Sequence, residues 1–78
     1  MEGLNDKEKK ILKFLYRYKV SFPTNYIAKR VGISWATAEN YLEILENEGY
    51  VISEERLGKT MYGLNLKKYK ELKQRYGV

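Results

Sequence analysis

The sequence contains no cysteine and no histidine, and these two absences exclude several kinds of chemistry. Without cysteine there are no disulfides and no thiolate metal sites. Without histidine the chain lacks the commonest metal ligand and general base. It also has no glycine loop that would cradle a phosphate and no close pair of carboxylates in an evident pocket. We therefore expect no enzyme activity, no metal and no cofactor.

Long hydrophobic runs are also missing. No apolar stretch approaches the roughly 20 residues of a membrane span, and residues 1–6 lack the charged-then-apolar order of a signal peptide. The simplest expectation is a cytoplasmic protein with no membrane partner. The 78 residues suffice for one domain, residues 1–78, with one small core. Because such a core leaves little stability to spare, dimerisation or close helix packing would help it.

Positively charged residues are missing from the middle of the chain. Residues 31–55 hold six Glu and no Lys or Arg. Residues 1–30 carry eight basic and three acidic residues, and residues 56–78 carry seven basic residues and one acidic. The basic ends could neutralise phosphates. An equally good reading is a thermophile's surface, which is rich in Lys and Glu and poor in Gln and Cys.

The most informative stretch is residues 31–51, which predicts a turn, a helix over 34–48 and the start of a strand. Gly32 permits a positive φ in the turn, Ser34 is a suitable N-cap, and Gly49 is the usual residue just past a helix end. Between them runs one apolar stripe at helical spacing. The stripe consists of Ala38, Tyr41, Leu42 and Leu45, and the opposite face carries Ala36, Asn40, Glu43 and Asn47.

Two further helices are predicted before this stretch, over residues 5–19 and 24–31. Asn5 or Asp6 can cap the first of them, with Glu8 placed for a capping box if Asn5 is the cap, and Thr24 can cap the second. Between them, residues 20–22 should form an extended bridge, because the residue before a proline avoids the helical region. The expected apolar stripe of the first helix is Ile11, Leu12, Leu15 and Tyr18.

After Gly49 the pattern predicts a hairpin over residues 50–64 and a last helix over 66–76. Residues 50–55 and 60–64 are rich in β-formers. The four residues 56–59 fit a loop with Gly58 at positive φ. We expect Tyr50 and Ile52 on one side of the first strand, and Asn65 as the cap of the last helix.

This order predicts an α+β, mostly helical fold: three helices, a two-stranded β-hairpin wing and a C-terminal helix. Residues 27–34, 36–38 and 41–51 resemble the central motif of winged helix-turn-helix transcriptional regulators, of the small MarR-like and ArsR-like or archaeal and viral kinds. The resemblance covers roughly residues 5–64. Such proteins usually bind double-stranded DNA as dimers, with the third helix in the major groove and the wing against the backbone or the minor groove.

The resemblance implies a set of DNA-binding residues in the third helix and the wing. Two departures stand beside it: residues 34–48 contain no Lys or Arg, and the Cys or His ligands of ArsR-like metal sensing are absent. By position, base-facing roles fall to Ser34, Trp35, Ala36, Thr37 and Asn40, and wing contacts to Arg56 and Lys59.

The residues themselves leave several of these roles open. Asn40 can pair with adenine or be a solvated polar residue. Trp35 can stack on the DNA backbone, join a partner surface or fold back on the core. Glu39 and Glu43 can accept from cytosine or be solvated, whereas Glu46 is expected to be solvated.

The last helix also has two interpretations. Its apolar residues can pack on the parent domain or form a two-fold dimer interface, and we favour the interface. Those residues are Tyr69, Leu72 and Tyr76. The function expected is a sequence-specific DNA-binding regulator, a repressor acting as a homodimer. The alternative is a protein-interaction winged helix that docks its acidic third helix on a basic partner.

Overall fold

The computed structural model describes the backbone of residues 4–76 and the side chains of residues 4–75. Three helices, the first two separated by a two-residue strand, are followed by a β-hairpin and a fourth helix. The short strand and the hairpin together form a three-stranded antiparallel sheet. No helix within residues 4–76 has the length and apolar character needed to cross a membrane. The elements are α1 (Asp6–Tyr18), β1 (Phe22–Pro23), α2 (Thr24–Val31), α3 (Trp35–Asn47), β2 (Val51–Arg56), β3 (Lys59–Leu64) and α4 (Leu66–Tyr76).

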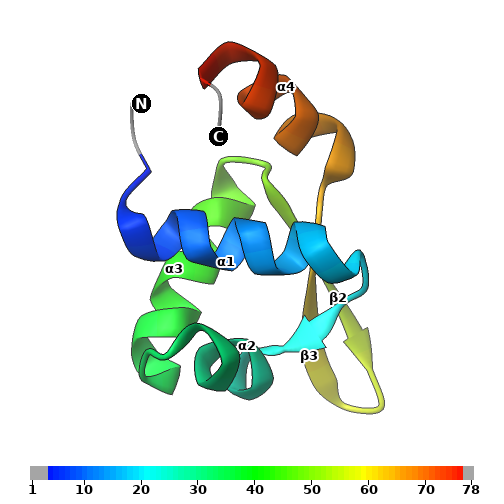
Figure 1. Ribbon diagram of the computed structural model, residues 1–78. Helices are drawn as coiled ribbons and strands as arrows, with labels where there is room; N and C mark the ends of the chain where they lie inside the picture. Colours follow the sequence, from blue (N-terminus) through cyan, green and yellow to red (C-terminus); the bar gives the residue numbers. More distant parts are fainter. Residues whose placement is uncertain (1–3, 77–78) are drawn as a thin grey trace.

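The arrangement gives the molecule two distinct ends (Figure 1). The first turn of α3 and the closed end of the β2–β3 hairpin lie at one end, and α4 lies at the other. Between them, α1 crosses the molecule and packs against α2, α3 and β3. Its fully buried residues, Ile11, Leu12 and Leu15, belong to one core cluster with Ile27, Leu42, Leu45, Val51 and Tyr62.

The predicted capping box of α1 is confirmed. The Asn5 side chain accepts from the Glu8 amide, and the Glu8 carboxylate accepts from the Asn5 amide, both at 2.9 Å. Together these bonds satisfy two amides that a helix start leaves unpaired. The helix ends at Lys19, whose left-handed φ of 56° stops the helical path.

The predicted cap of α2 is wrong. Pro23 occupies the N-cap position and makes no side-chain cap, while Thr24 is the first helical residue and is buried. Proline fixes its own φ but has no side-chain acceptor, so the first amides of α2 have no side-chain cap. The hydroxyl of Thr24 is therefore free to bond elsewhere. By contrast, Gly32 (φ 85°) and the Ser34 N-cap are confirmed.

The sheet has three strands rather than the expected two. Phe22 and Pro23 of β1 pair with Tyr62 and Met61 of β3, so β3 is central in the order β1-β3-β2. A proline is tolerated there because β1 is an edge strand. Gly63 permits the approach, since a Cβ at that position would lie 2.5 Å from the Ser21 hydroxyl oxygen.

The register of the hairpin corrects two details. Arg56 pairs with Lys59, which leaves only Leu57 and Gly58 in the loop instead of the four residues expected. Successive residues of a strand point to opposite faces. Val51 is accordingly buried and Ile52 is exposed, so the inward side begins at Val51.

An aromatic cluster joins α1, β1 and α2 at the surface. The Phe22 ring lies 5.1 Å from Phe14 and 5.0 Å from Tyr26, centroid to centroid. Tyr18 belongs to this cluster and is exposed, so its expected place in the apolar stripe of α1 is wrong. Arg30 donates to the hydroxyls of Tyr26 (2.7 Å) and Tyr18 (3.2 Å), and these hydrogen bonds, that of Tyr18 foremost, raise the pKa of Arg30.

The last helix packs on its own domain. Tyr69 and Leu72 are 2% and 3% exposed, and the Tyr69 ring lies 5.0 Å from that of Tyr16 on α1. The preferred interpretation, in which these two residues face a second copy, is therefore wrong for this structure, because they have almost no surface left to offer. The side chain of Tyr76, the third residue of that prediction, lies outside the described side chains.

Asn65 ties the start of α4 to the end of α3. Its side-chain oxygen accepts from the Lys68 amide (3.3 Å), which is the cap expected of it, and its side-chain nitrogen donates to the Gly49 carbonyl (2.9 Å).

Candidate nucleic-acid interface

The outer surface at the start of α3 carries small, mostly polar side chains and is accessible to solvent. Ser34 accepts from the Thr37 amide at 3.1 Å and donates to the Thr37 hydroxyl at 2.8 Å. This pair holds the first turn in place and engages the Thr37 hydroxyl internally. Ala36 and Asn40 are exposed, and Thr37 is half-buried. Ser34 and Thr37 are thus bonded to each other, whereas Ala36 and Asn40 present exposed side chains on this surface.

Trp35 stands at the entrance to this surface and does not fold back on the core. Its side chain is 55% exposed. It lines a shallow cleft that combines three parts of the chain: the start of α2, the first turns of α3 and the wing. The other residues lining the cleft are Pro23, Thr24, Asn25, Glu39, Lys59 and Thr60.

This cleft brings together residues that the sequence analysis treated separately. Lys59 of the wing and Trp35 of α3 were both predicted to contact DNA, and they share one cleft with Asn25. The first amides of a helix carry partial positive charge and attract anions. Lys59 and the start of α2 therefore supply positive charge to the cleft, and Glu39, which accepts from Thr24, supplies negative charge beside them.

Two of the α3 glutamates are tied to other elements rather than left free. Thr24 donates to Glu39 at 2.9 Å, and Ser53 donates to Glu46. The prediction that Glu46 is simply solvated is wrong, because it is half-buried against β2. Glu43, by contrast, is exposed.

The negative charge of the α3 glutamates affects the pKa of the buried Tyr62. Its pKa is raised, first by burial and then by the negative charges of Glu39, Glu46 and Glu43. These three carboxylates therefore make the surroundings of Tyr62 electrically negative. A polyanion would have to find its attraction elsewhere, at the cations beside α3.

The Thr24–Glu39 bond should contribute measurably to stability, because it links the two helices of the helix-turn-helix. Thr24→Val keeps the shape of the side chain and removes its donor. We expect a loss of about 1–2 kcal/mol in the free energy of unfolding, measured by urea denaturation. The matched control is Asn25→Ala at the neighbouring exposed position, which should change it by less than about 0.5 kcal/mol. Equal effects of the two substitutions would contradict a role for the bond.

The wing presents its two predicted cations differently. Arg56 forms an ion pair with Glu54 at 3.3 Å, and both side chains are substantially exposed. Within residues 4–75 the structure records no ion pair for Lys59. Lys59 is therefore the wing cation with the less committed charge.

The cations of α1 are placed on the opposite side of that helix from its core residues. Lys10, Lys13 and Arg17 are exposed, whereas Ile11, Leu12 and Leu15 face the core. Since α1 packs on α3 with its buried side, these cations point away from the α3 surface. Their contribution to a ligand on α3 would be a long-range one.

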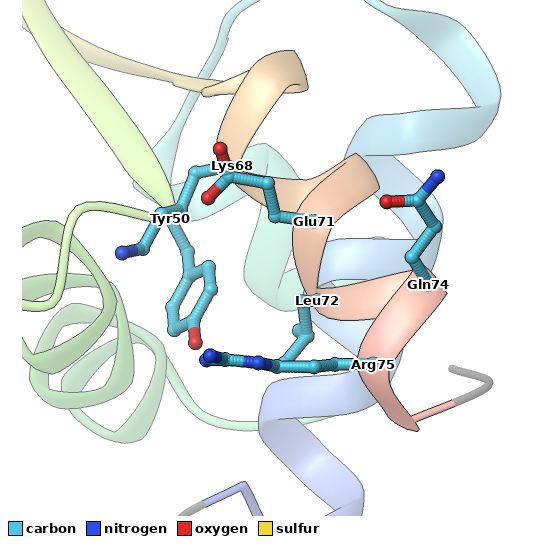
Figure 2. A pocket seen from close by; sticks show the side chains of 6 residues that line it. All are labelled: Tyr50, Lys68, Glu71, Leu72, Gln74 and Arg75. Carbon is cyan, nitrogen blue, oxygen red and sulfur yellow. The ribbon is translucent and has the colours of Figure 1, made fainter.

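A second hollow lies at the far end of α3, between the start of β2 and α4. Figure 2 shows the Arg75 guanidinium reaching towards the Tyr50 hydroxyl, while Gln74 points to the other side of α4. Lys68 lies over the Tyr50 ring at 5.8 Å. The residues lining the hollow are Tyr50, Lys68, Glu71, Leu72, Gln74 and Arg75. It is separate from the cleft at Trp35.

The fold and this surface define a winged helix-turn-helix domain of the α+β, mostly helical class, as the sequence predicts. A family model described as an HTH domain matches residues 7–58, more than half of the chain. The chain therefore belongs to this family of helix-turn-helix domains. A search of curated proteins found no match.

Solved structures support the fold. A probable transcriptional regulator from Pseudomonas aeruginosa is 19% identical in sequence and has a TM-score of 0.81. The match covers 92% of this chain and 56% of that protein. A second similar structure is the homodimeric winged helix-turn-helix DNA-binding domain Mb0332 from Mycobacterium bovis, a possible ArsR-family regulator. It is 22% identical with a TM-score of 0.75, and the match covers 87% of this chain and 61% of that one. The chain thus spans less than two thirds of either protein.

A third similar structure is a complex with nucleic acid. The Zalpha domain of PKZ from Carassius auratus, in complex with Z-DNA, is 26% identical with a TM-score of 0.65. The match covers 74% of this chain and 90% of that domain.

Proposed function

We propose that this protein is a sequence-specific double-stranded DNA-binding transcriptional regulator that acts as a repressor and binds as a homodimer. The observation that carries the proposal is the capped, exposed first half of α3 beside Lys59 in one cleft. The similar structures include one homodimeric DNA-binding domain and one domain bound to Z-DNA, which supports the same direction.

The arrangement divides the work between two kinds of residue. The side-chain amide of Asn40 offers a donor and an acceptor, and these match the acceptor and donor that adenine presents in the major groove. Lys59 and the amides at the start of α2 offer positive charge to phosphates, which carry affinity but no sequence information. Selectivity therefore comes from a neutral part of α3, and affinity from its surroundings.

The test begins with selection from random duplexes, followed by binding measurements on the recovered sequence. Asn40→Ala should cost about 1–3 kcal/mol of discrimination at one base position. Lys59→Ala should instead weaken binding on all sequences and reduce the salt slope by about 1. Lys70→Ala on α4 is the matched control and should leave binding unchanged. Stoichiometry on the selected duplex tests the homodimer, and two half-sites about one helical turn apart are expected.

A protein-interaction role for α3 is the second candidate. It is favoured by the exposure of Trp35 and by the absence of any cation in α3. Glu39 and Glu46 are already bonded to Thr24 and Ser53, which reduces the free acidic surface available to a basic partner. Failure of the protein to bind random duplex even at low salt would favour this candidate.

A further inference from the structure

Leu57, at the tip of the wing, is unusual both in the exposure of its apolar side chain and in its backbone conformation. Its side chain is 102% exposed, the most exposed large hydrophobic among residues 4–75. Its backbone also has φ 51°, in the left-handed region that L residues other than glycine, asparagine and aspartate rarely adopt. The tip residue therefore contributes no buried surface to the fold and carries backbone strain.

The hairpin itself does not require leucine there. A two-residue loop with positive φ at both positions is the type I′ turn, for which Asn-Gly is strongly preferred. Leu57 and Gly58 have φ of 51° and 77°, so asparagine would suit position 57 better. An apolar residue held at a strained tip is the kind of local conflict that points to a function.

The neighbours of Leu57 indicate what it would contact. Arg56 and Lys59 are directly paired across the hairpin, one on each side of the loop. Arg56 is partly neutralised by Glu54, while Lys59 shares the cleft with Trp35. An apolar tip between two cations is complementary to a ligand with a charged backbone and apolar interior steps, which is the chemistry of a DNA groove.

Resting on the proposed DNA-binding function, we propose that Leu57 is a wedge that inserts between base pairs in the minor groove beside the α3 site. Apolar side chains inserted in this way partly unstack a base step and kink the duplex, by roughly 20–90°. Pyrimidine–purine steps deform most easily. The wedge would therefore add a preference for such a step at a fixed distance from the bases that α3 contacts.

Three substitutions at position 57 separate the wedge from the turn. Leu57→Met keeps a long apolar side chain, Leu57→Ala removes the wedge and keeps the strain, and Leu57→Asn removes the wedge and relieves the strain. Duplex bending is measured by energy transfer between dyes at the two ends of the duplex recovered by selection. Affinity is measured on the same duplex, and thermal unfolding on each free protein.

The wedge predicts a combined result. Leu57→Ala and Leu57→Asn should lose the bend and bind about tenfold more weakly, whereas Leu57→Met should retain both. Leu57→Asn should nevertheless raise the unfolding midpoint by about 4 °C, so weaker binding cannot be ascribed to misfolding. Repeating the selection with Leu57→Ala should remove the pyrimidine–purine preference.

Two outcomes would overturn the proposal. In the first, Leu57→Ala binds and bends the selected duplex as the unsubstituted protein does. In the second, Leu57→Ala changes self-association and leaves bending intact, which would make the tip a contact between proteins. Failure of the unsubstituted protein to bind any duplex is a different result, because it removes the proposed function itself.

Discussion

Truncation of Tyr69 to alanine should remove about 3–5 kcal/mol from the free energy of unfolding. Tyr69 is 2% exposed, its ring is tilted against that of Tyr16 at a centroid distance of 5.0 Å, and it belongs to the same core cluster as Leu72. A domain of this size has only about 4–12 kcal/mol in total. The variant should therefore be marginally folded, which urea denaturation followed by circular dichroism would show.

Two controls make this result specific. Lys70→Ala, at the exposed position next to it, should change stability by less than about 0.5 kcal/mol. Tyr69→Phe keeps the buried ring and should cost less than about 1.5 kcal/mol. If Tyr69 instead faced a second copy, Tyr69→Ala would weaken self-association and leave the stability of the monomer nearly unchanged. A loss of stability no larger than that of Lys70→Ala would therefore contradict the packing seen here.

The features that could be predicted from the sequence are those set by residues close together in the chain. The capping box of Asn5 and Glu8, the Ser34 cap and the positive φ of Gly58 each involve a few consecutive residues. Their geometry follows from one hydroxyl, one carboxylate or one missing Cβ. For the same reason the order of the helices and the hairpin was predictable.

The features that could not be predicted join distant parts of the chain. The pairing of Phe22 with Tyr62 depends on a close approach that Gly63 permits, and no local pattern indicates it. The bond from Thr24 to Glu39 exists only once α2 and α3 have packed. In each case tertiary packing, and not the local sequence, determines the partner.

The candidate interface shows the same limit. The exposure of Asn40 follows from its position on the face opposite the apolar stripe, and the sequence is enough to predict it. That Lys59, Asn25 and Trp35 share one cleft depends on where the hairpin lies relative to the start of α2. The signal that could have drawn attention to Leu57 was present: a leucine immediately before Gly58 in a tight loop is an unusual choice.

Two adjacent residues of α3 should give opposite results and so test its orientation. Leu42 is 0% exposed in the core, and Leu42→Ala should cost about 2–5 kcal/mol of stability. Glu43 lies on the outer side, and Glu43→Ala should change stability by less than about 0.5 kcal/mol. Urea denaturation of the two variants measures both effects.

The same two substitutions, Glu43→Ala and Leu42→Ala, should also have opposite effects on DNA affinity. Glu43→Ala removes a negative charge from the surface proposed to face the groove, so binding to any duplex should tighten severalfold at low salt, and less at high salt because the repulsion is screened. Leu42→Ala should weaken binding only in proportion to the fraction unfolded. If Glu43→Ala leaves affinity unchanged at every salt concentration, the outer side of α3 does not face DNA, and the protein-interaction role becomes the better account of its acidic surface.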